Sequence, residues 1–200
     1  MKTKKIIIGE LLFLFVLVFV MMITNDIEWV DTNIYEGIMS LRSNLFDTLF
    51  KIITKAGNTI PVACITVICL ILWKKKERFI LGLSILVNLL LNQGLKYLVH
   101  RPRPEHLRLI EQNGYSFPSG HAMMSVALYG VLIYYIYKKM ENKYLKVAAM
   151  SLLSLLIFGI GCSRIYLGVH YPSDVIAGFS LALVILIIVI DWCNKNVKGE

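Results

Sequence analysis

The chain has 200 residues, of which 57% are apolar and only 17% are charged. A soluble domain averages roughly 45–50% apolar and 25% charged residues, so this composition excludes most soluble folds. A mean hydropathy of +0.67 also indicates a chain that prefers lipid. The low charge excludes a disordered chain, and the 13 glycines without a period exclude collagen. The length allows one domain, residues 1–200.

Six apolar runs predict membrane-spanning helices, since about 20 apolar residues cross about 30 Å of hydrocarbon. The first run follows three lysines, as in a signal peptide, but residues 21–26 (MMITND) offer no small-residue cleavage site, so we expect an uncleaved anchor. The second and fourth runs are short and need flanking residues. The predicted fold class is all-α, a polytopic membrane protein with a six-transmembrane helix bundle. The spans are expected at about 6–23, 59–73, 79–99, 122–137, 145–162 and 175–192.

Residues 26–56, between the first two spans, carry an amphipathic pattern. Apolar residues recur at steps of three and four, at Ile34, Ile38, Leu41, Leu45, Leu49 and Ile52. This predicts a helix on the outer membrane surface. It is either a cap over the bundle or a wall beside the path of a lipid, and the sequence leaves both open.

The basic residues predict the orientation. With the N-terminus inside, 13 of the 21 basic residues lie on the inner side, and eight basic residues face eight acids outside. All of the net charge of +8 therefore lies inside, as the positive-inside rule requires. We expect cytoplasmic termini in a multi-pass cell-membrane protein, and no nucleic-acid partner. The four cysteines show no metal-site spacing and are interpreted as small apolar helix residues.

Three polar clusters fall at the outer ends of the spans in this topology. The first holds Lys96 and the segment 100–104 (HRPRP), and the second is the segment 117–121 (FPSGH). The third holds Ser163, Arg164 and the segment 170–174 (HYPSD). An error of one span would place them on different sides, so their agreement supports the topology.

Cations and helix ends in these clusters suit a phosphate. Lys96, Arg103 and Arg164 have no matching acidic cluster, and Arg presents a planar fork to phosphate oxygens. With Pro118 in a first helical turn, the amides of residues 119–121 are expected to be unpaired at a helix N-terminus, where phosphate binds. Gly120 allows a close approach, and no Walker pattern indicates a nucleotide.

Two histidines supply reactivity. If Pro172 opens a helix, Asp174 lies within reach of one ring nitrogen of His170 and leaves the other as a nucleophile. His121, on another helix, can donate a proton to the leaving oxygen. Other polar residues are interpreted as structural: His100 and His106 as surface, Arg101 and Arg108 as interfacial cations, and Asn88 and Asn92 as interhelical hydrogen-bonding groups.

The motifs resemble those of the type 2 phosphatidic acid phosphatase superfamily of membrane lipid phosphatases. That family's signature is Lys-x6-Arg-Pro, then Pro-Ser-Gly-His, then Ser-Arg-x5-His-x3-Asp, and every position matches here in order and spacing. The resemblance implies that His170 is a nucleophile that forms a phosphohistidine, that Asp174 orients it, and that His121 protonates the leaving group. It implies a phosphate site without metal or cofactor, formed by Lys96, Arg103, Ser119, Gly120 and Arg164.

The resemblance implies a metal-independent lipid phosphatase acting at the outer membrane face. Compact members of the family act on phosphatidylglycerophosphate or undecaprenyl pyrophosphate, so phosphatidylglycerophosphate, a polyprenyl diphosphate and phosphatidate are all candidate substrates. A small soluble phosphate is a further possibility. The alternative function is a protein that binds or translocates a lipid phosphate without hydrolysis. The sequence leaves the substrate and the oligomeric state open.

Overall fold

The structure is a computed structural model that describes residues 2–104 and 108–197. These residues form eight α-helices and no strand. His106, interpreted above as a surface residue, lies outside the described residues. The four cysteines are free, and they lie in or at the ends of helices as expected.

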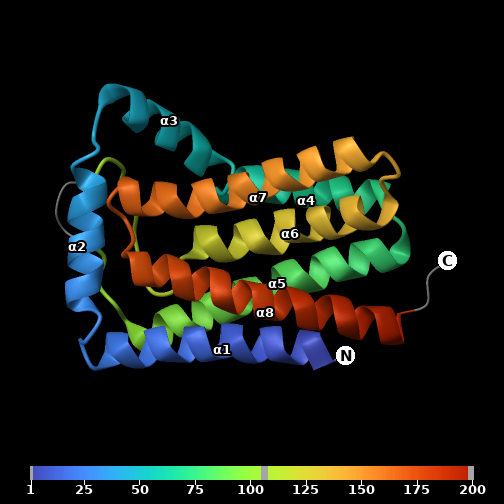
Figure 1. Cartoon of the computed structure of the whole chain (residues 1–200), viewed down its shortest axis with the longest axis horizontal. Helices are drawn as coiled ribbons and strands as arrows, with labels where there is room; N and C mark the ends of the chain where they lie inside the picture. The colour runs from blue at the N-terminus through green and yellow to red at the C-terminus, as the bar shows by residue number, and fades with distance from the viewer. Residues whose placement is uncertain (1, 105–107, 198–200) are drawn as a thin grey trace.

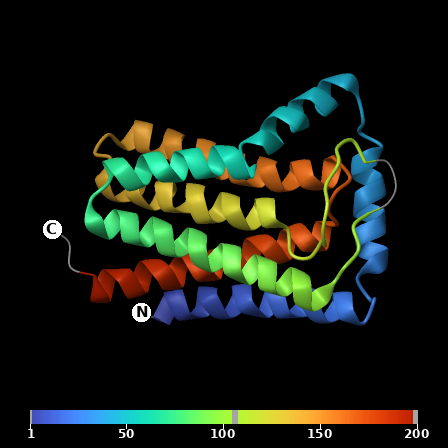
Figure 2. The ribbon, with the colours of Figure 1, turned by 180° about the vertical axis from the view of Figure 1, so that it is seen from behind.

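Five long helices lie side by side and form the bundle (Figures 1 and 2). Each is long and apolar enough to cross a membrane. The predicted all-α membrane bundle is therefore confirmed, and its helices extend a few residues beyond the apolar runs. They are α1 (Lys2–Ile23), α5 (Lys75–Val99), α6 (Gly120–Lys139), α7 (Lys143–Tyr166) and α8 (Pro172–Asn196).

The extra turns follow from capping residues that flank the apolar runs. Ser119 and Asn142 accept hydrogen bonds from the third residues of α6 and α7, Ala122 and Leu145. Pro172 is the first residue of α8, a position where its missing N–H costs nothing. Because the caps stand outside the apolar stretches, hydropathy alone places the helix ends too far inward.

The second predicted span is shorter than the others. It corresponds to α4 (Thr59–Leu72), whose 14 residues extend only about 21 Å at 1.5 Å per residue. The preceding α3 (Asn44–Lys55) meets it at a bend of 40°, and the pair together is apolar and long enough to count as a broken span. The described residues therefore contain five unbroken spans, and six when α3 and α4 are taken as one.

The expectation of a single surface helix between the first two spans is wrong, because the segment forms two helices. The first, α2 (Glu28–Met39), lies across one end of the bundle and contacts α7 and α8 (Figures 1 and 2). The chain then turns at residues 40–43, and the Ser43 side chain caps α3 by accepting from the Phe46 amide. A continuous apolar periodicity hid this break. Of the two interpretations of the segment, the cap fits α2.

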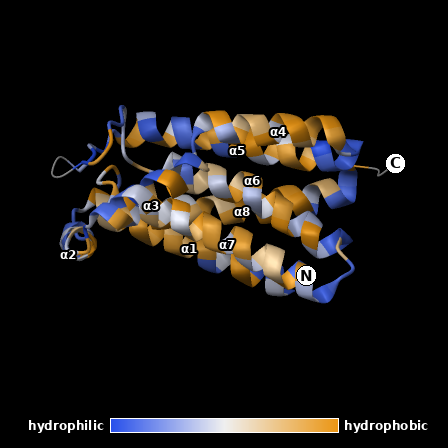
Figure 3. Ribbon diagram, turned by 90° about the horizontal axis from the view of Figure 1, so that it is seen from above, coloured by the Kyte–Doolittle hydropathy of each residue, from blue (hydrophilic) through white to orange (hydrophobic). Residues whose placement is uncertain are grey.

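Helix α6 lies at the centre and contacts α4, α5, α7 and α8. Apolar residues cover the middle of the long helices, and hydrophilic residues gather at the two ends (Figure 3). Helix α8 approaches the start of α6 closely at Gly178, where a Cβ would lie 3.0 Å from the Ser119 carbonyl oxygen. This packing brings the N-termini of α6 and α8 together.

Candidate active site

Four helix ends meet at the end of the bundle that α2 crosses. The C-termini of α5 and α7 and the N-termini of α6 and α8 all point there (Figures 1 and 2). The segment that joins α5 to α6, described at residues 100–104 and 108–119, runs between them. The three polar clusters of the sequence are thus brought to one end of the molecule, as predicted.

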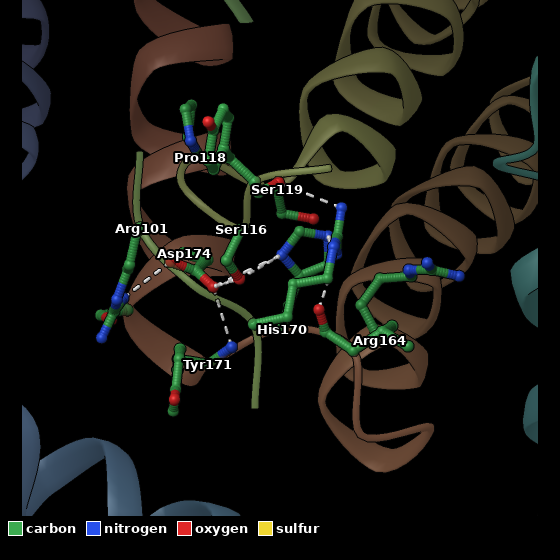
Figure 4. A network of polar contacts seen from close by, with 12 residues as sticks. Arg101, Ser116, Pro118, Ser119, Arg164, His170, Tyr171 and Asp174 are labelled. Carbon is green, nitrogen blue, oxygen red and sulfur yellow. Dashed lines mark hydrogen bonds and ion pairs between the residues drawn. The ribbon is translucent and has the colours of Figure 1, made fainter. Parts of the chain in front are cut away.

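His170 and Asp174 are adjacent and buried. Asp174 Oδ2 lies 3.4 Å from His170 Nδ1 and accepts hydrogen bonds from Ser116 Oγ at 2.5 Å and the Tyr171 amide at 2.9 Å (Figure 4). The carboxylate is inaccessible to solvent, and His170 is 2% exposed. Pro172 begins α8, as the sequence predicted, so the carboxylate on its first turn reaches back to the histidine.

The other ring nitrogen of His170 is held by an arginine. Arg103 Nη1 lies 3.0 Å from His170 Nε2. A guanidinium can only donate, so Nε2 accepts, and the ring hydrogen is assigned to Nδ1 beside Asp174. Burial, with Arg103 and Arg164 nearby, lowers the pKa of His170 to about 3 despite the opposing charge of Asp174. His170 therefore presents a neutral ring whose Nε2 lone pair accepts from Arg103 and becomes free for attack when Arg103 releases it.

Arg103 is fixed almost entirely by backbone carbonyls. Its guanidinium donates to the carbonyl oxygens of Val169 at 2.7 Å, Gly114 at 2.8 Å, Tyr115 at 3.1 Å and Asn113 at 3.2 Å. Burial lowers its pKa to about 10 although Asp174 opposes this. With the His170 contact, all five N–H groups are in use. Arg103 can thus contribute charge to the site, but a direct bond to phosphate requires it to release one of these partners.

Arg164, in contrast, is buried but keeps one hydrogen-bond donor without a partner among the described residues. It is 1% exposed, and it donates to Thr54 Oγ1 and Gln112 Oε1, both at 2.8 Å. Its Nε has no hydrogen-bond partner among the described residues. A buried guanidinium N–H without a partner is costly, so this group is suited to an anion that is not part of the chain.

Lys96, on the last turn of α5, completes the cationic set. Its Nζ donates to the carbonyl oxygens of Tyr115 and Ser116. Lys96, Arg103 and Arg164 form no ion pair with any carboxylate in the described part of the chain. Their positive charges are therefore not neutralised by a direct carboxylate partner, an arrangement that suits a phosphate.

The N-terminus of α6 differs in detail from the prediction. The helix begins at Gly120, so Pro118 precedes the cap and is not in the first turn. The Ser119 amide, expected to be unpaired, donates to the Asp174 carbonyl oxygen at 3.0 Å. This contact arises because α8 packs closely against the start of α6. Gly120 lines the cavity described below, and a Cβ on it would lie 3.1 Å from Asn92 Oδ1.

His121 lies on the first turn of α6, and its Nε2 is 2.8 Å from Asn58 Oδ1. Taken as a donor to that oxygen, Nε2 carries a hydrogen. Asn58 precedes α4 and was not singled out from the sequence. The sequence placed the start of a span directly after it, but the contact with His121 depends on how α4 packs against α6.

A cavity of about 560 Å³ connects several of these groups, although Arg164 and Asp174 do not line it. At one end it is lined by Lys96, Arg103, Gly120, His121 and His170. Its remaining wall comes largely from α4, α5 and α6 and is mainly apolar, with Val62, Val67, Ile85, Leu89 and Met124. One cavity thus joins a cationic end with two histidines to an apolar wall.

Two of the structural interpretations need correction. Arg101, expected to be an interfacial cation, forms ion pairs with Asp174 and Asp31, each at 2.7 Å. Asn88 bonds the Ser84 carbonyl of its own helix, whereas Asn92 crosses to the Pro118 carbonyl, as expected. The buried partners of Arg101 come from distant segments, so its role could not be seen locally. Arg108 and His100 are exposed.

The described residues hold no group of three or more His, Cys, Asp or Glu side chains arranged to bind a metal ion. Residues 77–198 match the family model described as the PAP2 superfamily. The chain belongs to the PAP2 superfamily. The family predicted from the motifs is thus confirmed, and with it a multi-pass membrane enzyme that hydrolyses phosphoric esters of lipids.

Two relatives are similar in sequence over more than half of the chain. Phosphatidylglycerophosphatase B of Bacillus subtilis (strain 168) is 31% identical over 191 residues, which cover 92% of this chain and 94% of that protein. Dolichyldiphosphatase of Saccharomyces cerevisiae is 32% identical over 118 residues, which cover 56% of this chain and 49% of that protein.

Two solved structures are similar to this one. The crystal structure of a transmembrane PAP2-type phosphatidylglycerolphosphate phosphatase from Bacillus subtilis matches with a TM-score of 0.84 and 26% identity, over 96% of this chain and 97% of that one. The crystal structure of Aquifex aeolicus LpxE matches with a TM-score of 0.68 and 27% identity, over 80% of this chain and 94% of that one.

Proposed function

We propose that this protein removes a phosphate from a membrane lipid phosphate or diphosphate through a phosphohistidine formed on His170. The observation that carries this proposal is the state of His170. Its Nε2 is an unprotonated acceptor in a cavity that also holds Lys96 and Arg103. A buried neutral imidazole among cations that lack carboxylate partners is suited to attack an anionic phosphorus centre.

In the first step, the Nε2 lone pair attacks phosphorus and the bond from phosphorus to the leaving oxygen breaks. The positive charge that develops on the ring is balanced by Asp174 beside Nδ1. His121 is proposed to take up a second proton when the charge of a bound phosphate dianion offsets the cations around it, and to give that proton to the leaving oxygen. Water then attacks the phosphohistidine, His121 takes the water's proton, and the P–N bond breaks to restore His170.

The phosphate oxygens are proposed to bind at the positive end of the cavity, where Lys96 offers its ammonium and Gly120 its backbone at the start of α6. Arg164 does not line the cavity, but its Nε has no partner among the described residues and is proposed to be the donor that a bound phosphate reaches. The Ser119 hydroxyl caps α6 and holds this helix end in place. Arg103 is proposed to release Nε2 before the attack and to turn its donor to the phosphoryl oxygens, where it stabilises the developing charge.

A lipid is the proposed substrate because the cavity wall is apolar away from the cations. Residues of α4, α5 and α6 can hold the first carbons of a lipid tail while its head group reaches His170. The relatives include proteins named phosphatidylglycerophosphatase and dolichyldiphosphatase. We therefore propose phosphatidylglycerophosphate, a polyprenyl diphosphate or phosphatidate as the substrate, with no metal or cofactor and no nucleic-acid partner.

The substrate experiment measures phosphate release by the purified protein in detergent from these three lipids and from a soluble phosphomonoester. We expect turnover of at least one lipid, inhibition by vanadate and no loss in excess chelator. Lipid transfer between leaflets without any phosphate release would favour the alternative of a binding or translocating protein. A strict metal requirement would contradict the proposed mechanism.

We also propose that the site faces outward and that both termini are cytoplasmic. The support is the concentration of basic residues at the end of the bundle opposite the site. In a cysteine-free variant, Leu41→Cys marks the site end and Lys143→Cys the opposite end. A membrane-impermeant maleimide added to intact cells should label only the former, and the reverse pattern would contradict this orientation.

A further inference from the structure

The carboxylate of Asp174 is held from two sides, and one side lies outside the family motifs. Its Oδ2 meets His170, Ser116 and the Tyr171 amide, as described above. Its Oδ1 accepts from Arg101 Nη1 at 2.7 Å (Figure 4). The same guanidinium uses Nη2 to reach Asp31 Oδ2, also at 2.7 Å. Arg101 thus joins two carboxylates with its two terminal nitrogens.

Asp31 belongs to α2, the helix that crosses the end of the bundle. It is 1% exposed and also bonds the start of α8, where its Oδ1 accepts from the Ser173 amide at 2.9 Å. Its Oδ2 accepts from the Ser173 hydroxyl at 2.5 Å. A carboxylate at a helix N-terminus satisfies an otherwise unpaired amide, so Asp31 caps α8 one residue before Asp174.

We propose that Asp31 and Arg101 are positioning residues, which hold the Asp174 carboxylate from α2 and set how strongly it acts on His170. This inference rests on the proposed function, because it assigns a role at the same site. Neither residue lines the cavity that holds His170, Lys96 and Arg103. Unlike Arg164, each also has its terminal polar atoms engaged by other groups of the chain, so we place neither against the phosphate.

Asp31 also affects the electrostatic interaction between Arg101 and Asp174. Asp31, Arg101 and Asp174 alternate in sign, so Arg101 divides its charge between two carboxylates. Burial lowers the pKa of Arg101, but Asp174 and Asp31 outweigh this and hold it above its ordinary value. Arg101 also lies over the Tyr171 ring, 4.2 Å from its centre. Asp31 therefore limits how much of the Arg101 charge acts on Asp174.

Other charged or titratable groups also act on the pair formed by His170 and Asp174. They come from α5, α6, α7 and the segment between α5 and α6, and they stay unchanged in the variants below. They are Lys96, His121, Arg164 and Arg103.

Among the variants of Asp31 and Arg101, the removal of Arg101 alone should lower kcat the most. In Arg101→Gln, two buried carboxylates face each other without a cation, so we expect kcat to fall about 100-fold. The uncompensated charge of Asp174 then favours a protonated His170, which moves the acid limb of kcat/KM to higher pH by about one unit.

The double variant Asp31→Asn with Arg101→Gln tests the positioning role. It removes the second negative charge, so we expect about tenfold higher kcat than in Arg101→Gln and an acid limb that moves back toward the wild type. If Asp31 and Arg101 only attached α2 to the bundle, the double variant should have a kcat no higher than that of Arg101→Gln, because it lacks both partners of the contact. A double variant no more active than Arg101→Gln would overturn the proposal.

Asp31→Asn alone keeps the test valid if Arg101→Gln does not fold. We expect kcat about tenfold lower with KM within about twofold, since Asp31 does not touch the substrate. Glu36→Gln, an exposed carboxylate on the same helix, is the matched control and should keep wild-type kinetics. Wild-type kcat in Asp31→Asn would reject the positioning role. A wild-type protein that releases no phosphate from any lipid would instead reject the proposed function.

Discussion

The two ends of the bundle use the same charged residue types in different ways. At the end opposite the site, Asp191 pairs with Lys4 at 3.1 Å and Lys195 at 2.7 Å, and the side chains are 38%, 59% and 65% exposed. At the site end, Arg101 pairs with Asp174 at 2.7 Å, where the side chains are 13% and 0% exposed. One set of charges is in water and the other is enclosed by protein.

The two ends differ in how firmly their charged side chains are held in place. Exposed ion pairs are screened by water and salt and hold their partners loosely, so they tolerate replacement. Buried charges lose their hydration, and each destabilises the fold unless other groups of the protein form hydrogen bonds or ion pairs with it. The carbonyl oxygens around Arg103 and Lys96 supply such partners without neutralising the charge. The site end thus maintains positive charge, at a cost, where a phosphate can use it.

The largest expected effect is that of His170→Ala. Loss of the proposed nucleophile should lower kcat/KM by about 1000-fold or more, with phosphate release from the preferred lipid as the measurement. Size-exclusion chromatography in detergent should show that the variant remains folded, because the substitution removes a neutral ring and no buried charge. Full turnover in a folded His170→Ala protein would rule out the phosphohistidine.

A cation removed from each end of one helix tests the contrast directly. Arg164→Ala at the site end of α7 should lower kcat/KM about 100-fold, because it removes a buried fork proposed to bind phosphate. Lys143→Ala, at the other end of α7 and exposed, is the matched control and should leave the rate unchanged. Equal effects of the two substitutions would remove the distinction between the ends.

The pH dependence sharpens the same distinction at His170. Its pKa is lowered to about 3, first by burial, so the neutral nucleophile exists above that value and is lost as the pH falls through it. We expect kcat/KM to show no acid limb from this group near 6.5, the ordinary histidine value. Rates measured from pH 4 to 8 in a detergent of fixed charge test this. An acid limb near 6.5 would contradict this prediction, unless it disappears when another histidine is replaced. In that case the limb belongs to that other histidine.

The smallest effect is expected for Asp191→Asn. Both of its ion pairs are exposed, so the melting temperature in detergent and the rate of phosphate release should equal those of the wild type. Repeating the melt at high salt provides the control, since salt already screens these pairs. A clear loss of stability would mean that the two ends are less different than their exposures indicate.

Much of the molecule could be predicted because it depends on local patterns. Hydropathy located the long helices. The spacing of His170, Pro172 and Asp174 placed a carboxylate beside a histidine, since one helix start determines their geometry. The boundary between α3 and α4 fell where the sequence placed the start of a span, at residue 59. The break after α2 was not predicted, because the apolar period continues across residues 40–43.

The sequence by itself determined the membrane-spanning helices, the family and the residues of the cationic and histidine clusters, because each rests on contiguous patterns of a few to about twenty residues. Only the tertiary structure decided which groups surround them. Asp31 meets Ser173 across 142 residues, and Arg101 meets both Asp31 and Asp174. These contacts exist because α2 crosses the end of the bundle above the start of α8, and no periodicity or spacing in the chain encodes that crossing.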